Sequence, residues 1–424
     1  MSSDPALLLA RLLGPEGRAL EAALAAGDPA ERGSPRAVAA LRRLADAELV
    51  ALALRLDAAR ARQHLKFPPE EPLRFTPELL EQASSHPVAT HRAQRLAPLG
   101  PVLDLGCGAG GDLTRLAAAG AAVTGLEADP LAAALARANL AALGLAGQVI
   151  TGRYPGTALP AHRALFIDPA RREGGAGGRR HRNPGAFSPA PALIAPLLAR
   201  AEAWCLKWGP ALPLTAEALS GSAGPLAGLA PGDWELETVS WRGELREALL
   251  WGGAARCGAA RQATLLIGSL RDWTALSYAG DGSAPPPAPT APGVPGGPCV
   301  HEPDPALIRA GLVDAFAAQH GLSPLAPGIA YLAGEAVGSP FVRRWRILEI
   351  LPLSLGGLQA ALDRQGAGPL VLKKRGFPLD PEILRPRLVG RGERPVTVLI
   401  YRDGRDRRAP HRAEHWVCLG AEEG

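Results

Sequence analysis

An acidic residue inside a strand-like run, followed by a glycine-rich turn, is the strongest chemical signal in this sequence. The run Val102–Leu105 contains Asp104, and Gly106 and Gly108 follow directly. Glycines let the backbone pass close beneath a ligand and adopt dihedral angles that a Cβ hinders. A second strand-like run ends in Glu127, twenty-three residues after Asp104. A carboxylate at that place can accept both hydroxyls of a ribose, so the pattern predicts a nucleoside-containing ligand.

The spacing D-x-G-x-G in this turn resembles motif I of the class I S-adenosylmethionine-dependent methyltransferases. It differs from G-x-G-x-x-G, which makes an NAD site the weaker alternative. The resemblance implies S-adenosyl-L-methionine as the cofactor, and we expect Cys107 to face it with its backbone rather than its thiol. The residues implied in cofactor binding are Asp104, Leu105, Gly106, Cys107, Gly108, Glu127 and Ala128.

A second motif, D-P-A-R at residues 168–171, follows the strand-like run Ala164–Ile167. It resembles the (D/N)-P-P-x motif of methyltransferases that modify nucleic acids, with Ala170 in place of the second proline. No aromatic residue follows that would stack on a flipped base. Asp168 can accept a proton from a target nitrogen or bind it by a hydrogen bond. We predict Asp168 and Arg171 as catalytic residues, and a plain Asp-Pro turn at a strand end is the alternative.

Basic residues gather in two places that suit the phosphates of a nucleic acid. Arg172 opens a loop rich in arginine and glycine, for which a solvated loop is an almost equally good interpretation. The segment Val371–Arg412 holds twelve basic and five acidic residues, a net +7 against +5 for the whole chain. Charge concentrated in this way indicates a polyanionic partner. The predicted substrate-binding residues are Arg172, Lys373, Lys374 and Arg375.

The same C-terminal segment resembles a THUMP-like domain, which caps a family of bacterial class I methyltransferases. The similarity lies in residues 372–376, in residues 380–388 and in the strand-like run Val396–Tyr401. Further similarity to that family lies in residues 301–310 and 75–83. THUMP domains bind RNA, so the resemblance implies an RNA substrate, tRNA or rRNA.

Alternating strand-like and helix-like runs must position these residues, and they predict an α/β fold. The resemblance implies a Rossmann-like, mostly parallel seven-stranded sheet. We expect an N-terminal helical region at 1–70, the methyltransferase domain at 71–272, a Pro/Gly-rich linker at 273–298 and a C-terminal α+β region at 299–424, with the THUMP-like domain at about 345–412. The expected strands of the methyltransferase domain are Pro101–Leu105, Ala122–Leu126, Gln148–Thr151, Ala164–Ile167, Ala203–Lys207, Glu235–Ser240 and Ala263–Ile267. In the C-terminal region we expect helices at Pro305–His320, Leu355–Gln365 and Pro381–Leu388, and strands at Arg346–Leu351, Leu370–Lys374 and Val396–Tyr401.

Composition excludes several other classes of protein. The chain of 424 residues lacks an uncharged apolar run of about 18 residues, so no membrane span or membrane partner is expected. Five cysteines, odd in number and widely spaced, favour a reducing cytoplasm over a disulfide framework. The histidines and cysteines form no complete zinc ligand set, and we predict no metal.

Two residues of one strand-like run require separate interpretation. Cys205 lies in mid-strand and is expected in the core. Lys207 follows it, and is either directed at the site or structural.

These observations together predict a cytoplasmic enzyme that transfers a methyl group from S-adenosyl-L-methionine to a base of structured RNA. One alternative is a methyltransferase that acts on a small molecule or a protein. Another is a non-catalytic RNA-binding protein that keeps the methyltransferase fold. The oligomeric state does not follow from the sequence.

Overall fold

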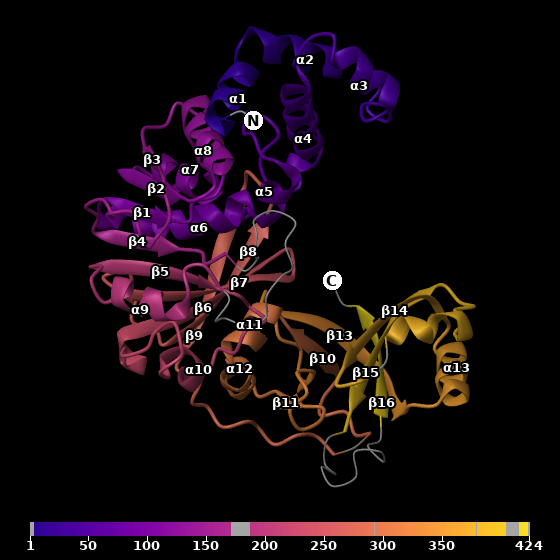
Figure 1. Cartoon of the computed structure of the whole chain (residues 1–424). Coiled ribbons are helices and arrows are strands. Elements are labelled where there is room, and N and C mark those ends of the chain that lie inside the picture. Colours follow the sequence, from indigo (N-terminus) through magenta and orange to yellow (C-terminus); the bar gives the residue numbers. More distant parts are fainter. Residues whose placement is uncertain (1–3, 171–186, 292, 379, 404–414, 423–424) are drawn as a thin grey trace. The chain divides into compact units, whose positions relative to one another are not determined.

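The computed structural model describes residues 4–170, 187–291, 293–378, 380–403 and 415–422 (Figure 1). The chain divides into two units. Unit 1 consists of residues 1–242, 246–258 and 266–276, and unit 2 of residues 243–245, 259–265 and 277–424. In the described residues, no helix has the length and apolar character needed to cross a membrane.

Unit 1 begins with helices that start at well-defined caps. The side chains of Asp4, Ser34 and Asp46 each accept a hydrogen bond from a backbone N–H of the first turn, which satisfies a donor that the helix leaves open. Apolar side chains of these helices pack into one buried cluster with Phe67 and Phe75. The helices before the sheet are α1 Pro5–Leu13, α2 Pro15–Ala26, α3 Pro35–Leu41, α4 Ala47–Gln63, α5 Pro77–Gln82 and α6 His86–Leu96, followed by the short η1 Ala97–Leu99.

A nine-stranded sheet in the order β3-β2-β1-β4-β5-β7-β6-β8-β9 forms the main framework. Strands β3, β2, β1, β4 and β5 pair in parallel, and β7 runs antiparallel to β5. Because β1 pairs with both β2 and β4, the strand order reverses beside β1, where α/β sheets open a ligand crevice. The strands are β1 Val102–Leu105, β2 Val123–Glu127, β3 Gln148–Thr151, β4 Ala164–Ile167, β5 Ala203–Trp208, β6 Trp234–Trp241, β7 Glu244–Gly253, β8 Arg261–Gly268 and β9 Trp273–Gly280.

The central strands are buried on both faces, as parallel strands covered by helices must be. Val102 of β1 belongs to one apolar cluster, whereas Leu103 and Leu105 belong to the cluster on the other face. The connecting helices are α7 Gly111–Ala118, α8 Pro130–Ala142, α9 Pro191–Leu198 and α10 Ala216–Ser220, with η3 Pro231–Asp233 before β6.

The structure corrects three details of the expected fold. The sheet has nine strands in the described residues rather than seven. Residues 273–280 form β9 instead of the start of a linker. Leu276 and Tyr278 in β9 alternate with more exposed neighbours, which is the pattern of a strand covered on one face. The run 381–388, expected to be helical, forms only the short η4 Pro381–Ile383 and η5 Arg385–Arg387, because Pro386 offers no backbone N–H.

Unit 2 contains a seven-stranded mixed sheet in the order β11-β12-β10-β13-β16-β15-β14. Helix α13, Leu355–Arg364, packs Leu358 and Leu362 against one face of this sheet. Strands β10, β11, β12 and β16 were not anticipated in the sequence. The strands are β10 Cys299–Pro303, β11 Ser323–Pro324, β12 Leu332–Gly334, β13 Val342–Pro352, β14 Ala367–Arg375, β15 Arg394–Arg402 and β16 His415–Glu422, and the other helices are α11 Pro305–Ala310 and α12 Val313–Gln319.

Candidate active site

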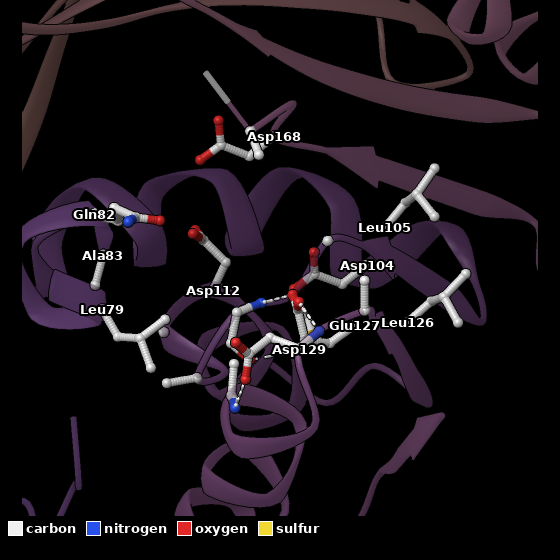
Figure 2. Close-up of a pocket in the computed structure, with 18 of the residues that line it drawn as sticks. Leu79, Gln82, Ala83, Asp104, Leu105, Asp112, Leu126, Glu127, Asp129 and Asp168 are labelled. Atoms are coloured by element: carbon white, nitrogen blue, oxygen red, sulfur yellow. Dashed lines mark hydrogen bonds between the residues drawn. The ribbon is translucent and has the colours of Figure 1, made fainter. Parts of the chain in front are cut away.

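A pocket of about 390 Å³ opens in unit 1 at the carboxyl ends of β1, β2 and β4. Its volume lies within the range of small-molecule and cofactor sites. The turn after β1 and the end of β2 form one side of the pocket, and Asp168 after β4 lies at its edge (Figure 2). The sequence-predicted residues Asp104, Leu105, Gly106, Cys107, Gly108, Glu127, Ala128 and Asp168 all line this pocket.

The glycine-rich turn has the backbone geometry that its sequence indicates. Gly106 has φ +86° and Gly108 has φ +55°, a left-handed region in which a side chain is strained. A Cβ on Gly108 would meet no atom within 4 Å, so the turn presents bare backbone. The N–H of Gly106 donates to the carbonyl of Leu126 at 2.8 Å, which ties the turn to the end of β2.

Glu127 braces this turn from the end of β2. Its Oε2 accepts the N–H of Gly108 at 2.8 Å, and its Oε1 accepts the N–H of Asp129 at 2.8 Å (Figure 2). Asp129 in turn caps α8 by accepting the N–H groups of Leu131 and Ala132. Each carboxylate oxygen of Glu127 has a second lone pair, so both oxygens retain capacity for a further donor.

Asp104 is the most unusual group in the pocket. It is 1% exposed, and its Oδ2 has no hydrogen-bond partner among the described residues. Burial raises the pKa of the Asp104 carboxyl well above its ordinary value, and the neighbouring Asp112 and Asp168 carboxylates raise it further. A buried carboxylate oxygen without a donor costs stability. The arrangement fits a ligand that brings a cationic donor to Asp104.

The types of charged residue that line the whole pocket also favour a cationic ligand. Six acidic and three basic side chains line it, an excess of three acidic groups. Such a lining favours a cationic ligand over an anionic dinucleotide. S-adenosylmethionine carries a sulfonium and an ammonium group, so the residues present fit it. The acids are Glu81, Asp104, Asp112, Glu127, Asp129 and Asp168, and the bases are Arg55, Arg153 and Lys207.

Cys107 lies beside Asp104 with its thiol turned into the protein. Burial raises the pKa of the Cys107 thiol well above its ordinary value, and Asp104 and Glu127 add to this effect. Its Sγ fills the space above Gly125, where an added Cβ would lie only 2.6 Å from the sulfur. A thiol held neutral in this way is a poor nucleophile.

We therefore expect Cys107→Ala to bind cofactor within about threefold of the wild-type affinity, since only backbone faces the pocket. Calorimetric titration with S-adenosylhomocysteine measures this directly. Gly108→Ala is the matched variant, because it places a Cβ at a positive φ and in the open pocket, and its affinity should fall by more than tenfold. Equal losses in the two variants would contradict the assignment of backbone as the contacting group.

Asp168 meets a lysine that the sequence alone did not assign. Lys207, near the end of β5, donates from Nζ to Oδ2 of Asp168 at 2.6 Å and to Oγ of Ser84 at 3.2 Å. The side chain of Asp168 is 29% exposed and that of Lys207 is 12% exposed. Burial opposes the charged form of Lys207, but Asp168, with Asp112 and Glu247, outweighs it and raises the Lys207 pKa above its ordinary value. The ion pair therefore holds the Asp168 carboxylate at the pocket edge.

A buried arginine lies behind the pocket and contacts one of the residues that line it. Arg92 of α6 is 2% exposed and bonds to Asp112, Glu247 and Ser84. Its guanidinium also lies over the Phe166 ring at 5.2 Å from the centroid. The Arg92 guanidinium thus compensates the negative charge of Asp112, which lines the pocket, and of the buried Glu247.

Residues before β1 complete the pocket, and sequence reasoning gave them no role there. Phe75, Thr76, Leu79, Gln82 and Ala83 line it from α5 and its flanks. Figure 2 draws Leu79, Gln82 and Ala83 across the opening from Leu105 and Leu126. The only signal in the sequence was the family similarity of residues 75–83.

The remaining predicted residues lie elsewhere. Arg171 and Arg172 lie outside the described residues, so the structure says nothing of them. Lys373 and Arg375 are half-buried on β14 of unit 2, and both form ion pairs with Glu302. Lys374 between them is exposed. In the described part of the chain, no group of three or more His, Cys, Asp or Glu could hold a metal ion.

Comparisons with known proteins place these observations in a family. A methyltransferase domain model matches residues 102–166, and a THUMP domain-like model matches residues 342–415. Uncharacterized S-adenosylmethionine-dependent methyltransferases from two strains of Mycobacterium tuberculosis are 36% identical over 337 residues, which covers 78% of this chain and 85% of theirs. The crystal structure of a presumed methyltransferase from Porphyromonas gingivalis W83 has the same fold, with a TM-score of 0.71, 21% identity and full coverage of both chains. The chain thus belongs to the S-adenosylmethionine-dependent methyltransferases, with a THUMP-like domain in its C-terminal part.

Proposed function

We propose that this methyltransferase modifies a base of structured RNA, tRNA or rRNA, and that the pocket at β1, β2 and β4 is its cofactor and methyl-transfer site. The observation that carries the proposal is the Asp168–Lys207 pair, which lines the same pocket as Asp104 with its orphaned Oδ2. One carboxylate is free for a cationic donor, and the other is held in place at the pocket edge.

The roles of the pocket residues follow from their surroundings. The Oδ2 atom of Asp104, which has no partner in the free protein, accepts a hydrogen bond from the ammonium group of the cofactor. Glu127 uses its remaining acceptor capacity for the ribose hydroxyls while it braces Gly108. The backbone of residues 105–108 forms the floor on which the ligand rests. When bound, S-adenosylmethionine supplies an electrophilic methyl group.

Asp168 acts on the acceptor. An ionised carboxylate at the pocket edge can accept a hydrogen bond from an N–H of a base and take its proton as the nitrogen is methylated. Lys207 fixes the orientation of Asp168 through the 2.6 Å ion pair. Much of the rate enhancement then comes from holding nucleophile and methyl group in line. No stacking aromatic follows Ala170, so base binding relies on other groups.

The THUMP-like match at residues 342–415 and the basic character of that segment support RNA as the substrate. Exposed basic side chains in the described part of the segment include Lys374, Arg387 and Arg394. Lysine and arginine on a surface contact phosphates without regard to sequence.

Reversing this charge should weaken RNA binding without touching the pocket. We expect the triple variant Lys374→Glu, Arg387→Glu and Arg394→Glu to raise KM for RNA at least about tenfold and to flatten the salt dependence. Its affinity for S-adenosylhomocysteine should stay at the wild-type value. An unchanged KM and salt slope would remove these three residues from the RNA-binding surface.

Transfer of labelled methyl groups tests the substrate class. The wild-type protein is incubated with labelled S-adenosylmethionine and an extract of a strain that lacks it, with and without ribonuclease. Label that disappears with ribonuclease supports the proposal, and digestion to nucleosides then identifies the base. Label that resists ribonuclease shows a protein or metabolite substrate and overturns it. Absence of label, with cofactor binding confirmed, favours a binding protein.

A further inference from the structure

The wall of the pocket opposite the glycine-rich turn rests on a very short element. Helix α5 has only six residues, Pro77–Gln82, and its last turn with Ala83 lines the pocket. Glu81 and Gln82 are exposed. A helix this short has few internal hydrogen bonds and little intrinsic stability. Something outside α5 must therefore hold this wall in place.

Lys66 supplies that hold from the segment after α4. Its Nζ donates to the carbonyls of Leu80 at 2.9 Å, Glu81 at 2.6 Å and Ala83 at 2.7 Å. All three ammonium donors are thereby used. Carbonyls at a helix C-terminus have no partner in the helix and carry partial negative charge, so a cation is well placed there. The carbonyl of Lys66 also accepts the N–H of His86 at 2.7 Å.

Ser84, which lies just after α5, connects the same turn to Lys207 and so to Asp168 at the pocket edge. Its Oγ accepts from Arg92 Nη2 at 2.8 Å and from Lys207 Nζ at 3.2 Å. The Lys207 ammonium in turn pairs with Asp168. A continuous series of contacts thus runs from Lys66 through the turn 80–84 to the proposed proton acceptor.

We propose that Lys66 is a positioning residue of the methyl-transfer site, whose ammonium fixes the turn 80–84 so that it walls the cofactor pocket and holds Lys207 against Asp168. The proposal rests on the proposed function, because it takes the pocket as the cofactor site. It gives the N-terminal helical region a role in the reaction, since Lys66 belongs to that region and is remote in sequence from both motifs.

The proposal has a consequence for pH dependence. Burial lowers the pKa of Lys66 to about 8, and the positive charges of Lys207 and Arg246 contribute. The charged groups that face it are Arg62 from α4, Glu81 from α5, Lys207 from β5 and Arg246 from β7. Loss of its proton removes the charge and one of three donors, so a carbonyl of the turn loses its partner while Lys66 stays buried. The turn then shifts locally as pH rises through this value. Cofactor affinity should fall over the same range.

Global stability responds to Lys66 in the opposite sense. The folded chain releases this proton at lower pH than the unfolded chain, whose Lys66 titrates near the ordinary value of 10.5. The Lys66 contribution to the free energy of unfolding therefore rises with pH between these two values. A general loss of stability therefore cannot account for a fall in affinity over this range of pH.

Three variants test the proposal in the full-length protein. Lys66→Met removes the ammonium, Lys66→Arg keeps the charge at higher pH, and Arg62→Met removes a neighbouring exposed cation as a control. Hydrogen exchange of residues 79–86 is measured in the free protein. S-adenosylhomocysteine is titrated by calorimetry at about pH 7 and about pH 9, on either side of the Lys66 pKa.

We expect Lys66→Met to exchange faster at 79–86 and to lose about tenfold in affinity at both pH values. The wild type should lose affinity between the lower and the higher pH, Lys66→Arg should lose less, and Arg62→Met should follow the wild type. If Lys66→Met folds poorly, the pH profiles of wild type and Lys66→Arg decide the question.

Wild-type exchange rates in a folded Lys66→Met variant, or identical pH profiles for wild type and Lys66→Arg, would overturn the proposal. Failure of the wild type to bind S-adenosylhomocysteine at any pH would instead refute the cofactor site under the proposed function. The exchange comparison in the free protein still decides whether Lys66 fixes the turn.

Discussion

Replacing Asp104 with asparagine is expected to abolish cofactor binding and, at the same time, to stabilise the free protein. Affinity for S-adenosylhomocysteine should fall at least about a hundredfold, because a buried amide cannot pair with an ammonium group. The substitution should raise the stability of the free protein, because it removes a buried carboxyl group whose Oδ2 has no hydrogen-bond partner. The expected rise in Tm is about 2–4 °C for each kcal/mol of relieved desolvation.

The sign of the stability effect follows from linkage. Burial raises the pKa of Asp104 in the folded chain, so the folded state holds this proton more tightly than the unfolded state. Stability therefore falls as pH rises from the ordinary value of 3.8 through the folded pKa. Above the ordinary pKa the buried carboxyl group is therefore a net cost, which asparagine removes. The gain in Tm should shrink at acidic pH, where Asp104 is already protonated in both states.

Asp129→Asn is the matched control for Asp104. Asp129 also lines the pocket, but it is exposed and serves as the N-cap of α8, a place where asparagine is equally suitable. We expect its affinity for S-adenosylhomocysteine to stay within about threefold of wild type. Thermal unfolding and calorimetry of both variants measure the two effects. Wild-type affinity in Asp104→Asn would exclude Asp104 from the cofactor site.

Replacing Asp168 with asparagine is expected to separate catalysis from binding. Methyl transfer should slow by about 10²–10⁴-fold, the usual contribution of a positioned general base. Affinity for S-adenosylhomocysteine should remain within about threefold, since Asp168 lies at the pocket edge and not beneath the glycine-rich turn. Single-turnover rates and calorimetry on the same preparation give both values. Full turnover in Asp168→Asn would show that the carboxylate is not the proton acceptor.

Lys207→Met distinguishes a functional pair from two independent residues. If Lys207 acts only through Asp168, the double variant should be about as slow as Asp168→Asn alone, and the two losses should not add. Lys207→Arg keeps the charge and should recover part of the rate. Fully additive losses would assign Lys207 a contact with the substrate instead.

The central part of the fold could be predicted closely from the sequence. The five parallel strands agree with the expected ranges to within one residue at either end, because short apolar runs end at turns that glycine, proline or aspartate mark. Asp104, Gly108 and Glu127 come together because the ends of adjacent parallel strands meet at one edge. The spacing of these residues along the chain was sufficient to predict that they share one site, without knowledge of contacts between distant segments.

Other features depend on contacts between distant segments, which local patterns do not record. Lys207 lies thirty-nine residues from Asp168, and Ser84 lies 123 residues from Lys207. The strand pattern of β5 allowed Lys207 to face either the site or the core. Lys66 reads as an ordinary exposed lysine until α5 places three carbonyls around it. Pairing in the sheet likewise made a strand of Trp273–Gly280, which sequence composition assigned to a linker.

The most direct test compares the wild type, Asp104→Asn and Asp168→Asn in transferring labelled methyl groups from S-adenosylmethionine to a whole extract of a strain that lacks the protein, with and without ribonuclease. The account predicts ribonuclease-sensitive label with the wild type alone. It also predicts that Asp168→Asn still binds S-adenosylhomocysteine and that Asp104→Asn does not. Label transferred to RNA at the wild-type rate by either variant would contradict the site, and label found only in ribonuclease-resistant material of the whole extract would contradict RNA as the substrate.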